Sequence, residues 1–292
     1  MKDRIEFVLF KLFYYFFRML PLRTAVFIGS LIGGLNYFLS GIRVKLVKQQ
    51  LNSAFPEKNK KEINSIARST YSNLMKTAIE YYWLADKPKS MIEKIVNIQG
   101  LEYLNQALSK GKGALLVTGH FDSWEITAIL LDLLGYKLSV VLKPQRNKLF
   151  NDFTNRLRNR GSIGLIEMKY AFRGIIKALR HNRLVAILGD QDARHNGIFV
   201  DFLNKPASTY PGIAKISLKT GTPIIFAISI RQKNNTHKLI IRPPIYPKKS
   251  GNIEQDIIKY TRFHTKLLED YVRKYPDQWF WVHKRWKTRP KQ

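Results

Sequence analysis

The stretch Gly113-Ala-Leu-Leu-Val117, followed by Thr118-Gly-His-Phe-Asp-Ser-Trp-Glu125, decides the fold of this chain. Its apolar first part is too short for a helix and is bounded by glycines, so we predict a buried β-strand. Asp122 is placed to cap the next helix, with Glu125 closing a capping box on the Asp122 N–H. The helix then continues with an apolar face of Ile126, Ile129, Leu130, Leu133 and Leu134. His120 therefore lies on a turn at the carboxyl end of a strand, where open α/β sheets bind ligands.

His120 and Glu125 are the side chains of this stretch that indicate chemistry. Within one helix they would point to different faces, but with His120 on the turn and Glu125 in the first helical turn they can meet. A carboxylate bonded to one imidazole nitrogen fixes the tautomer and leaves the other nitrogen as a base. We therefore predict that both are catalytic. The alternative is a turn histidine beside a capping glutamate.

Strands and helices alternate in the rest of the chain. Predicted strands lie at 113–117, 138–142, 184–188, 223–230 and 239–242. Helical patterns at 101–109, 124–134, 147–160, 171–180, 210–220 and 253–274 separate most of them, and residues 44–93 are also helical in pattern. Such alternation predicts an α/β fold with a largely parallel central sheet flanked by helices on both faces.

Asp190, Gln191 and Asp192 directly follow the predicted strand 184–188. They therefore lie at the carboxyl end of a strand, as His120 does, and we expect them to orient polar substrate groups or to hold an arginine. Two carboxylates alone are a weak sign of magnesium. One histidine and one glutamate supply few ligands for zinc, and the chain has no cysteine, so we predict no metal site and no cofactor. The other histidines show no comparable context and are expected on the surface or in packing: His181, His195, His237, His264 and His283.

The charge of the chain requires an anionic partner. There are 50 Lys and Arg against 21 Asp and Glu, a net charge of +29, which suits nucleic acid, an acidic membrane surface or an acidic protein. Global disorder is excluded because 45% of the residues are hydrophobic. The lack of cysteine also excludes disulfides and a thiolate nucleophile.

The N-terminal segment favours the membrane among these partners. Residues 7–17 are rich in aromatic side chains, and residues 24–42 carry no charge over a length at the lower limit for a membrane span. Gly29 and Gly33 permit close helix approach, either in a membrane or against another part of the protein. We predict a hydrophobic helical membrane anchor at residues 1–45 and one α/β domain at 46–292. Whether the anchor spans the bilayer or lies in one leaflet stays open.

The motif His120-Phe-x-x-Trp-Glu125 resembles that of the lipid A biosynthesis acyltransferases of the lauroyl/myristoyl type, within the wider His-x4-Asp/Glu lysophospholipid acyltransferases. Further segments resemble the same family in the expected order: Asn52-Ser-Ala-Phe-Pro-Glu57, Gly189-Asp-Gln-Asp192, Pro206-Ala-Ser-Thr-Tyr-Pro-Gly212, Lys219-Thr-Gly-Thr-Pro223 and Pro276-Asp-Gln-Trp-Phe-Trp-Val-His-Lys-Arg-Trp-Lys287. The last of these segments suits either a lipid headgroup boundary or packing on the sheet with its charges in water. The resemblance covers nearly the whole chain.

The resemblance implies a glycerolipid-acyltransferase-like fold and a membrane-bound O-acyltransferase. Such an enzyme moves a fatty acyl chain from an acyl thioester to a hydroxyl of a lipid A precursor or related glycolipid. The donor would be acyl carrier protein, favoured over acyl-CoA, and the acceptor an anionic lipid at the bacterial inner membrane, with the site facing the cytoplasm. The resemblance also places an arginine of the Arg156, Arg158 and Arg160 block near the site. Arg158 and Arg160 are the candidates for substrate binding, and Arg173 matches a further family position.

The sequence favours direct acyl transfer, since it has neither a cysteine nor a Gly-x-Ser-x-Gly nucleophile turn. In this mechanism His120 removes the proton of the acceptor hydroxyl, Glu125 holds the imidazole, and an arginine of 156–173 or a backbone N–H stabilises the oxyanion. One alternative is the same reaction on a lysophospholipid or another glycolipid. Another is a non-enzymatic protein that binds membrane or nucleic acid, although the chain has no nucleic-acid recognition motif and we expect no such partner.

Overall fold

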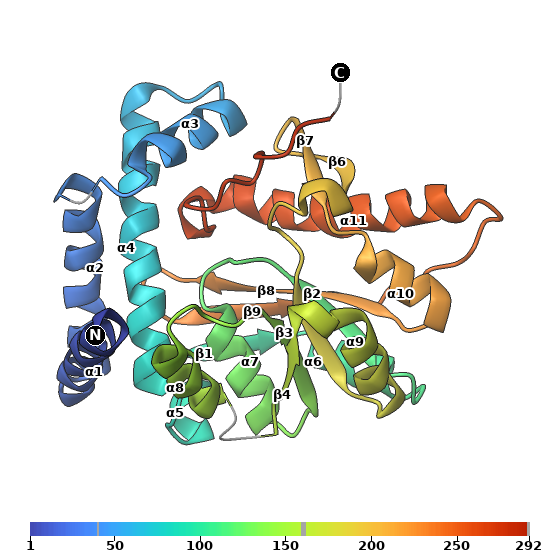
Figure 1. Ribbon diagram of the computed structural model, residues 1–292, viewed down its shortest axis with the longest axis horizontal. Helices are drawn as coiled ribbons and strands as arrows, with labels where there is room; N and C mark the ends of the chain where they lie inside the picture. The colour runs from blue at the N-terminus through green and yellow to red at the C-terminus, as the bar shows by residue number, and fades with distance from the viewer. Residues whose placement is uncertain (40, 159–161, 291–292) are drawn as a thin grey trace.

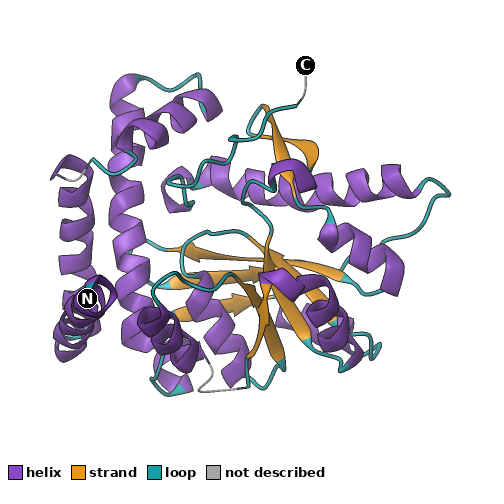
Figure 2. Ribbon diagram, viewed as in Figure 1, coloured by secondary structure: helices purple, strands orange, loops and turns teal. Residues whose placement is uncertain are grey.

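The computed structural model describes residues 1–39, 41–158 and 162–290. Within them a seven-stranded sheet has the order β1-β9-β8-β2-β5-β3-β4, with helices on both faces (Figure 1; Figure 2). All its neighbouring strands are parallel except β8 and β9. The strands are β1 (Val96–Gln99), β2 (Ala114–Thr118), β3 (Leu138–Leu142), β4 (Gly164–Glu167), β5 (Leu184–Leu188), β8 (Ile224–Arg231) and β9 (His237–Ile241). The predicted fold, a largely parallel sheet flanked by helices, is confirmed.

The strand β2 is covered on both faces, as its uninterrupted apolar sequence predicts. Its side chains alternate between two cores. Leu116 packs with helices α6 and α7, whereas Leu115 and Val117 pack with α9 and α10. The helices that follow the strands are α6 (Leu101–Leu108), α7 (Trp124–Leu133), α8 (Lys148–Arg158), α9 (Ala171–Arg180), α10 (Gly212–Thr220) and α11 (Ile253–Lys274). The turn after β2 therefore starts from a rigid support.

A two-stranded hairpin outside the main sheet was not predicted. Its strands β6 (Ile198–Phe202) and β7 (Lys205–Thr209) are antiparallel and joined by Leu203 and Asn204, both with positive φ. Two left-handed residues in a two-residue loop match the twist of a hairpin. The alternation of buried Val200 and Phe202 with exposed neighbours was the available signal. The short strands β1 and β4 were also missed, because each has only four residues.

Residues 2–93 are largely helical, and the sheet begins only after them. The helices are α1 (Lys2–Met19), α2 (Leu22–Leu39), α3 (Val44–Ala54), α4 (Lys60–Leu84) and α5 (Lys89–Glu93). The long helix α4 lies between α1 and α2 on one side and the sheet on the other (Figure 1). Its first turn is fixed by a capping box, in which Asn59 accepts from the Glu62 N–H and Glu62 accepts from the Asn59 N–H.

The glycines of α2 allow it to pack closely on α4. A Cβ added at Gly33 would lie 2.4 Å from the Tyr71 carbonyl oxygen and 2.7 Å from the Ser72 Cα. A Cβ at Gly29 would lie 2.4 Å from the Ile79 Cδ1. Sequence analysis predicted that these glycines permit close helix approach, either in a membrane or against another part of the protein. The structure shows the second, since both glycines lie against α4.

The other faces of α1 and α2 expose large apolar side chains. Among the described helices, α2 is the one long and apolar enough to cross a membrane, with a mean hydropathy of 1.3 and 33% of its length buried. Exposed apolar side chains of the two helices are Ile5, Val8, Leu9, Leu12, Tyr15, Phe16, Met19, Phe27, Leu31, Leu35, Phe38 and Leu39. A monomer in water rarely exposes so many together. The anchor at residues 1–45 and the division at that point stay predictions.

Substitution of Gly33 tests the packing of α2 on α4. We expect Gly33→Ala to lower the free energy of unfolding by about 1–3 kcal/mol, because the new methyl group meets backbone atoms that cannot rotate away. Gly34→Ala is the matched control, since its Cβ would lie 3.5 Å from the Ser72 Oγ, an ordinary contact. Chemical denaturation in detergent micelles measures both, and equal stabilities of the two variants would contradict this packing.

Candidate active site

The imidazole of His120 is held by the carboxylate of Asp190. The turn that carries His120 follows β2, and Asp190 follows β5, the parallel neighbour of β2. The His120 Nδ1 lies 2.7 Å from the Asp190 Oδ1, and the His120 backbone N–H donates to the Asp190 Oδ2 at 2.8 Å. The carboxylate is 2% exposed and the imidazole 21% exposed. The ring is thus fixed from the protein side and open towards solvent on the other.

Asp190 is ionised in this setting. Burial by itself would raise its pKa, but the nearby His120 charge and the hydrogen bonds from His120 and Trp279 outweigh burial and lower the pKa to about 2. An ionised carboxylate on Nδ1 favours the tautomer with the proton on that nitrogen. The other nitrogen, Nε2, is the acceptor in this tautomer and lies 3.3 Å from the Gln191 Nε2, an amide donor on the exposed side of the site.

The C-terminal segment (residues 276–288) supports the site through two hydrogen bonds. The Trp279 indole N–H donates to the Asp190 Oδ2 at 2.8 Å, and the Phe280 backbone N–H donates to the His120 carbonyl at 3.0 Å. The Trp279 side chain is buried, and the backbones of Phe121 and Trp279 form an isolated antiparallel β-bridge. Of the two interpretations of this segment, packing on the sheet is the one in the structure, and even Arg285 is buried.

Glu125 binds Arg158 instead of His120. The Glu125 carboxylate accepts two hydrogen bonds from the guanidinium, 2.5 Å from Nη2 and 3.1 Å from Nε. Within the described part of the chain, no hydrogen bond joins Glu125 to His120. The expected pairing is therefore corrected: the carboxylate on the imidazole belongs to Asp190, because the first turn of α7 directs Glu125 towards α8. A catalytic role for Glu125 stays a prediction.

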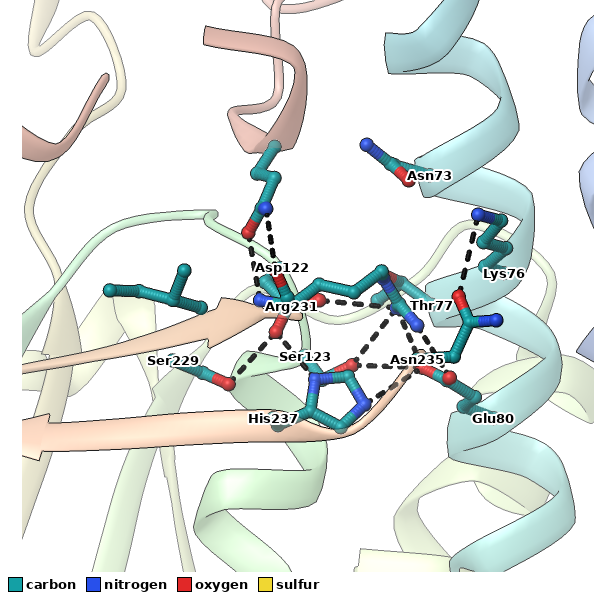
Figure 3. Close-up of polar contacts among 12 residues, drawn as sticks. Asn73, Lys76, Thr77, Glu80, Asp122, Ser123, Ser229, Arg231, Asn235 and His237 are labelled. Carbon is teal, nitrogen blue, oxygen red and sulfur yellow. Dashed lines mark hydrogen bonds and ion pairs between the residues drawn. The ribbon is translucent and has the colours of Figure 1, made fainter. Parts of the chain in front are cut away.

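The predicted capping box at the start of α7 is wrong. The N-cap residue is Ser123, and its side chain makes no capping hydrogen bond. The Asp122 N–H donates to the Gln278 carbonyl at 2.9 Å, so it is not available to Glu125. The carboxylate of Asp122 points instead into a buried cluster with Arg231 and His237 (Figure 3). Sequence analysis did not name Arg231, and it expected His237 on the surface or in packing, whereas His237 is ion-paired with two carboxylates.

The remaining candidate residues differ in their placement. Arg158 is ion-paired with Glu125, Arg156 is exposed on α8, and Arg160 lies outside the described residues. Arg173 is exposed in the first turn of α9. Asp192 accepts from the Thr288 hydroxyl at 2.9 Å and thus holds the C-terminal segment.

Two residues of the site were missed or underrated. Trp279 lay in a recognised motif, but its contact with Asp190 depends on folding. His283 was expected on the surface or in packing, and its Nε2 accepts from the Asp192 N–H at 3.0 Å, so it helps to fix the 190–192 segment. Among the described residues, no group of three His, Cys, Asp or Glu side chains is arranged to hold a metal ion.

The imidazole is also bordered by aromatic rings. The Trp124 ring centroid lies 5.2 Å from that of His120, with the two rings at 67°, and the Phe280 centroid lies 5.8 Å away. The site thus combines three features. The His120 imidazole is held by an ionised carboxylate, aromatic rings border it, and the Glu125–Arg158 ion pair joins the first turn of α7 to the end of α8. Such a site can activate a hydroxyl group beside an apolar substrate.

The chain is similar to known proteins over nearly its full length. Residues 4–288 match the family model of bacterial lipid A biosynthesis acyltransferases. The lipid A biosynthesis palmitoleoyltransferase of Escherichia coli (strain K12) is 26% identical over 280 residues, which cover 93% of this chain and 87% of that protein. The lipid A biosynthesis lauroyltransferase of the same organism is 24% identical over 278 residues, which cover 93% of this chain and 88% of that protein.

Among solved structures, the 1-acyl-sn-glycerophosphate acyltransferase PlsC from Thermotoga maritima aligns with 87% of this chain and 99% of its own, at 15% identity and a TM-score of 0.39. The family match covers His120, the acidic segment after β5 and the C-terminal segment together. By sequence over almost its whole length, this chain belongs to the bacterial lipid A biosynthesis acyltransferase family, as its ordered motifs predict.

Proposed function

We propose that this protein is a membrane-bound O-acyltransferase that moves a fatty acyl chain from an acyl thioester to a hydroxyl of a lipid A precursor or a related glycolipid. The observation that carries the proposal is the His120 imidazole, with an ionised carboxylate on Nδ1 and its Nε2 on the open side of the site. Membership of the family supports the lipid A acceptor.

In the proposed reaction, the His120 Nε2 takes the proton of the acceptor hydroxyl as its oxygen attacks the thioester carbonyl carbon. A C–O bond forms, the tetrahedral intermediate collapses, and the C–S bond breaks. The imidazolium then gives its proton to the leaving thiolate. Asp190 stabilises the imidazolium between these steps. General-base assistance of this kind contributes about 10²- to 10⁴-fold in rate.

Arg158 is our candidate for the group that stabilises negative charge on the carbonyl oxygen. Glu125 fixes the guanidinium through two hydrogen bonds, and both side chains are only about one-fifth exposed (18% and 23%). Burial by itself would lower the pKa of Arg158, but the Glu125 charge and hydrogen bonds raise it above its ordinary value, so the arginine stays charged. A fixed cation needs little reorganisation as charge develops in the transition state.

The positive charge of the protein supports acyl carrier protein as donor and an anionic lipid as acceptor. Exposed cations follow β3 and β4, at the same edge of the sheet as His120: Lys143, Arg146, Lys148, Lys169 and Arg173. They suit an acidic carrier protein or a lipid phosphate, each cation near an anionic leaflet being worth about 1 kcal/mol. With α1 and α2 against the bilayer, we place the protein at the bacterial inner membrane with its site facing the cytoplasm.

Loss of the base tests the reaction directly. We expect His120→Ala to lower kcat by about 10²- to 10⁴-fold, because the hydroxyl then loses its proton acceptor. Asp190→Asn keeps the shape of the side chain but removes the charge that stabilises the imidazolium, and we expect a smaller fall in kcat at unchanged KM. His195→Ala, at an exposed histidine, is the control.

The assay follows transfer of a labelled acyl chain from acyl carrier protein, with acyl-CoA in parallel, to lipid A precursor or lysophospholipid in detergent micelles. Mass spectrometry of the product identifies the ester formed. Full activity of His120→Ala would remove this residue from the mechanism. Transfer to lysophospholipid alone would replace the proposed acceptor.

A double-mutant cycle separates the two possible roles of Glu125. If Glu125 acts by holding Arg158, we expect Glu125→Gln and Arg158→Gln each to lower kcat, and the double variant to lose little more than either one. If Glu125 acts on His120 instead, the two losses in activation free energy add. Arg156→Gln, an exposed arginine on the same helix, should keep wild-type kcat.

A further inference from the structure

Four charged side chains are buried together behind the turn that carries His120. Glu80 comes from α4, Asp122 from the turn, Arg231 from the end of β8 and His237 from the start of β9 (Figure 3). Their side chains are between 0% and 4% exposed. Because the cluster is closed to solvent, none of the four can contact substrate.

Each cation of this cluster contacts both carboxylates. The Arg231 guanidinium lies 2.5 Å and 2.6 Å from the two Glu80 oxygens and 3.1 Å from the Asp122 Oδ1. The His237 Nδ1 lies 2.6 Å from the Asp122 Oδ2, and its Nε2 lies 3.4 Å from the Glu80 Oε2. With both cations charged, two positive charges balance two negative ones, which buried charges require.

Two serines donate hydrogen bonds to the carboxylates of the cluster. The Ser229 hydroxyl donates to the Asp122 Oδ2 at 2.9 Å, and the Ser123 hydroxyl donates to the Glu80 Oε2 at 3.1 Å. Ser123 is also the N-cap residue of α7, the helix that carries Glu125 in its first turn. Two consecutive residues between His120 and Glu125 are therefore held in the cluster: Asp122 is one of its members, and Ser123 is hydrogen-bonded to Glu80.

The backbone of Asp122 needs such support. Its φ of +43° is in the left-handed region, which residues other than glycine rarely adopt and which persists only where the surroundings impose it. Asp122 follows His120 by two residues, so a change in its backbone would redirect the imidazole. On the other side of the same turn, His120 is fixed by Asp190.

The cluster also connects this turn to the N-terminal helices. Glu80 follows Ile79 on α4, and Ile79 contacts α2 at Gly29. Two consecutive residues of α4 therefore contact the helix with the exposed apolar face and the cluster behind the site. A shift of α4 against the sheet would disturb both.

We propose that Glu80, Asp122, Arg231 and His237 form a positioning cluster for acyl transfer, which imposes the left-handed turn at Asp122 and so aims the His120 imidazole and orients the start of α7. None of the four is a catalytic residue, since they act through the backbone of the turn. The inference rests on the proposed role of His120. A displacement of a reacting group by about 1 Å can cost ~10²-fold in rate, so a positioning role has a measurable effect.

The charge state of His237 gives the cluster a dependence on pH. Burial by itself would lower the pKa of His237, but Asp122 and Glu80 outweigh burial and raise the pKa to about 9 from an ordinary 6.5. The charged groups that face His237 are Glu80 from α4 and Asp122 from the turn. Arg231 from β8 shares both carboxylates with it, and Lys76 and Asp277 lie on the side of Arg231. The stabilisation by His237 is therefore complete below pH 6.5 and lost as the pH rises through about 9.

The test compares variants of the whole protein in detergent micelles, with circular dichroism to establish that each is folded. Asp122→Asn keeps the size of the side chain and removes its charge. We expect kcat to fall ~10- to 10²-fold while KM for the acyl donor stays unchanged, because the base is misdirected and not removed. Asp122→Gly, which accepts the left-handed backbone but has no carboxylate, should lose kcat as well.

The dependence on pH distinguishes positioning from general stability. We expect wild-type kcat and stability to fall together as the pH rises from 7 to 10, and His237→Gln to show a low kcat with a flatter profile. His264→Gln is the matched control, because His264 is equally buried but its pKa is lowered to about 4, chiefly by burial and then by Arg285. This control should keep the wild-type profile.

Ser229→Ala decides the matter if Asp122→Asn does not fold, since it removes one hydrogen bond to Asp122 and leaves all four charges. A several-fold fall in kcat at constant KM is then expected, and an unchanged kcat would overturn the inference. Failure of the inference differs from failure of the proposed function: in the first case His120→Ala is inactive while folded Asp122→Asn keeps wild-type kcat. In the second, His120→Ala itself stays active.

Discussion

The parallel register of β2 and β5 is the constraint on which the site depends. Thr118 pairs with Leu188 at the ends of these strands, so the residues two places further, His120 and Asp190, come side by side. Gly119 leaves room for this approach, since a Cβ there would lie 2.8 Å from the Leu268 Cδ2 and 3.2 Å from the Asp190 Oδ2. Two central strands, buried on both faces, thus bring an imidazole and a carboxylate together at their carboxyl ends.

Once this pair is formed, the rest of the structure holds it in place. The C-terminal segment adds Trp279 to the carboxylate and Phe280 to the backbone of His120. The positioning cluster fixes Asp122 from the opposite side. The side chains of Trp279 and of the cluster are buried, and hydrogen bonds are stronger in such surroundings than in water. The His120 Nε2 is left on the exposed side of a turn that is otherwise fixed.

The layered arrangement also relates the site to a lipid surface. α4 lies between the sheet and the apolar α1 and α2, as Figure 1 shows, and one turn of it contacts both α2 and the positioning cluster. In the proposed function, the acceptor lipid reaches the site from the membrane while the charged donor approaches the basic edge of the sheet. The apolar faces of α1 and α2 would then contact the membrane, and the cations after β3 and β4 would bind the donor.

The sequence by itself determined the α/β class, most strand and helix ranges, the family and the position of His120 at a strand end. These follow from local periodicity and from ordered motifs, which do not depend on distant contacts. It also placed Asp190 at a neighbouring strand end, but did not identify it as the partner of His120.

Only the tertiary structure decided which charged groups meet. Glu125 is five residues from His120, yet it binds Arg158 on another helix, while the carboxylate on His120 comes from 70 residues away. His237, which looked like a packing residue, is a charged member of a buried cluster built from four segments. The physical reason is that the pairing of charged side chains depends on strand order, register and helix direction. These are properties of the whole fold, so the local sequence around a charged residue does not identify its partner.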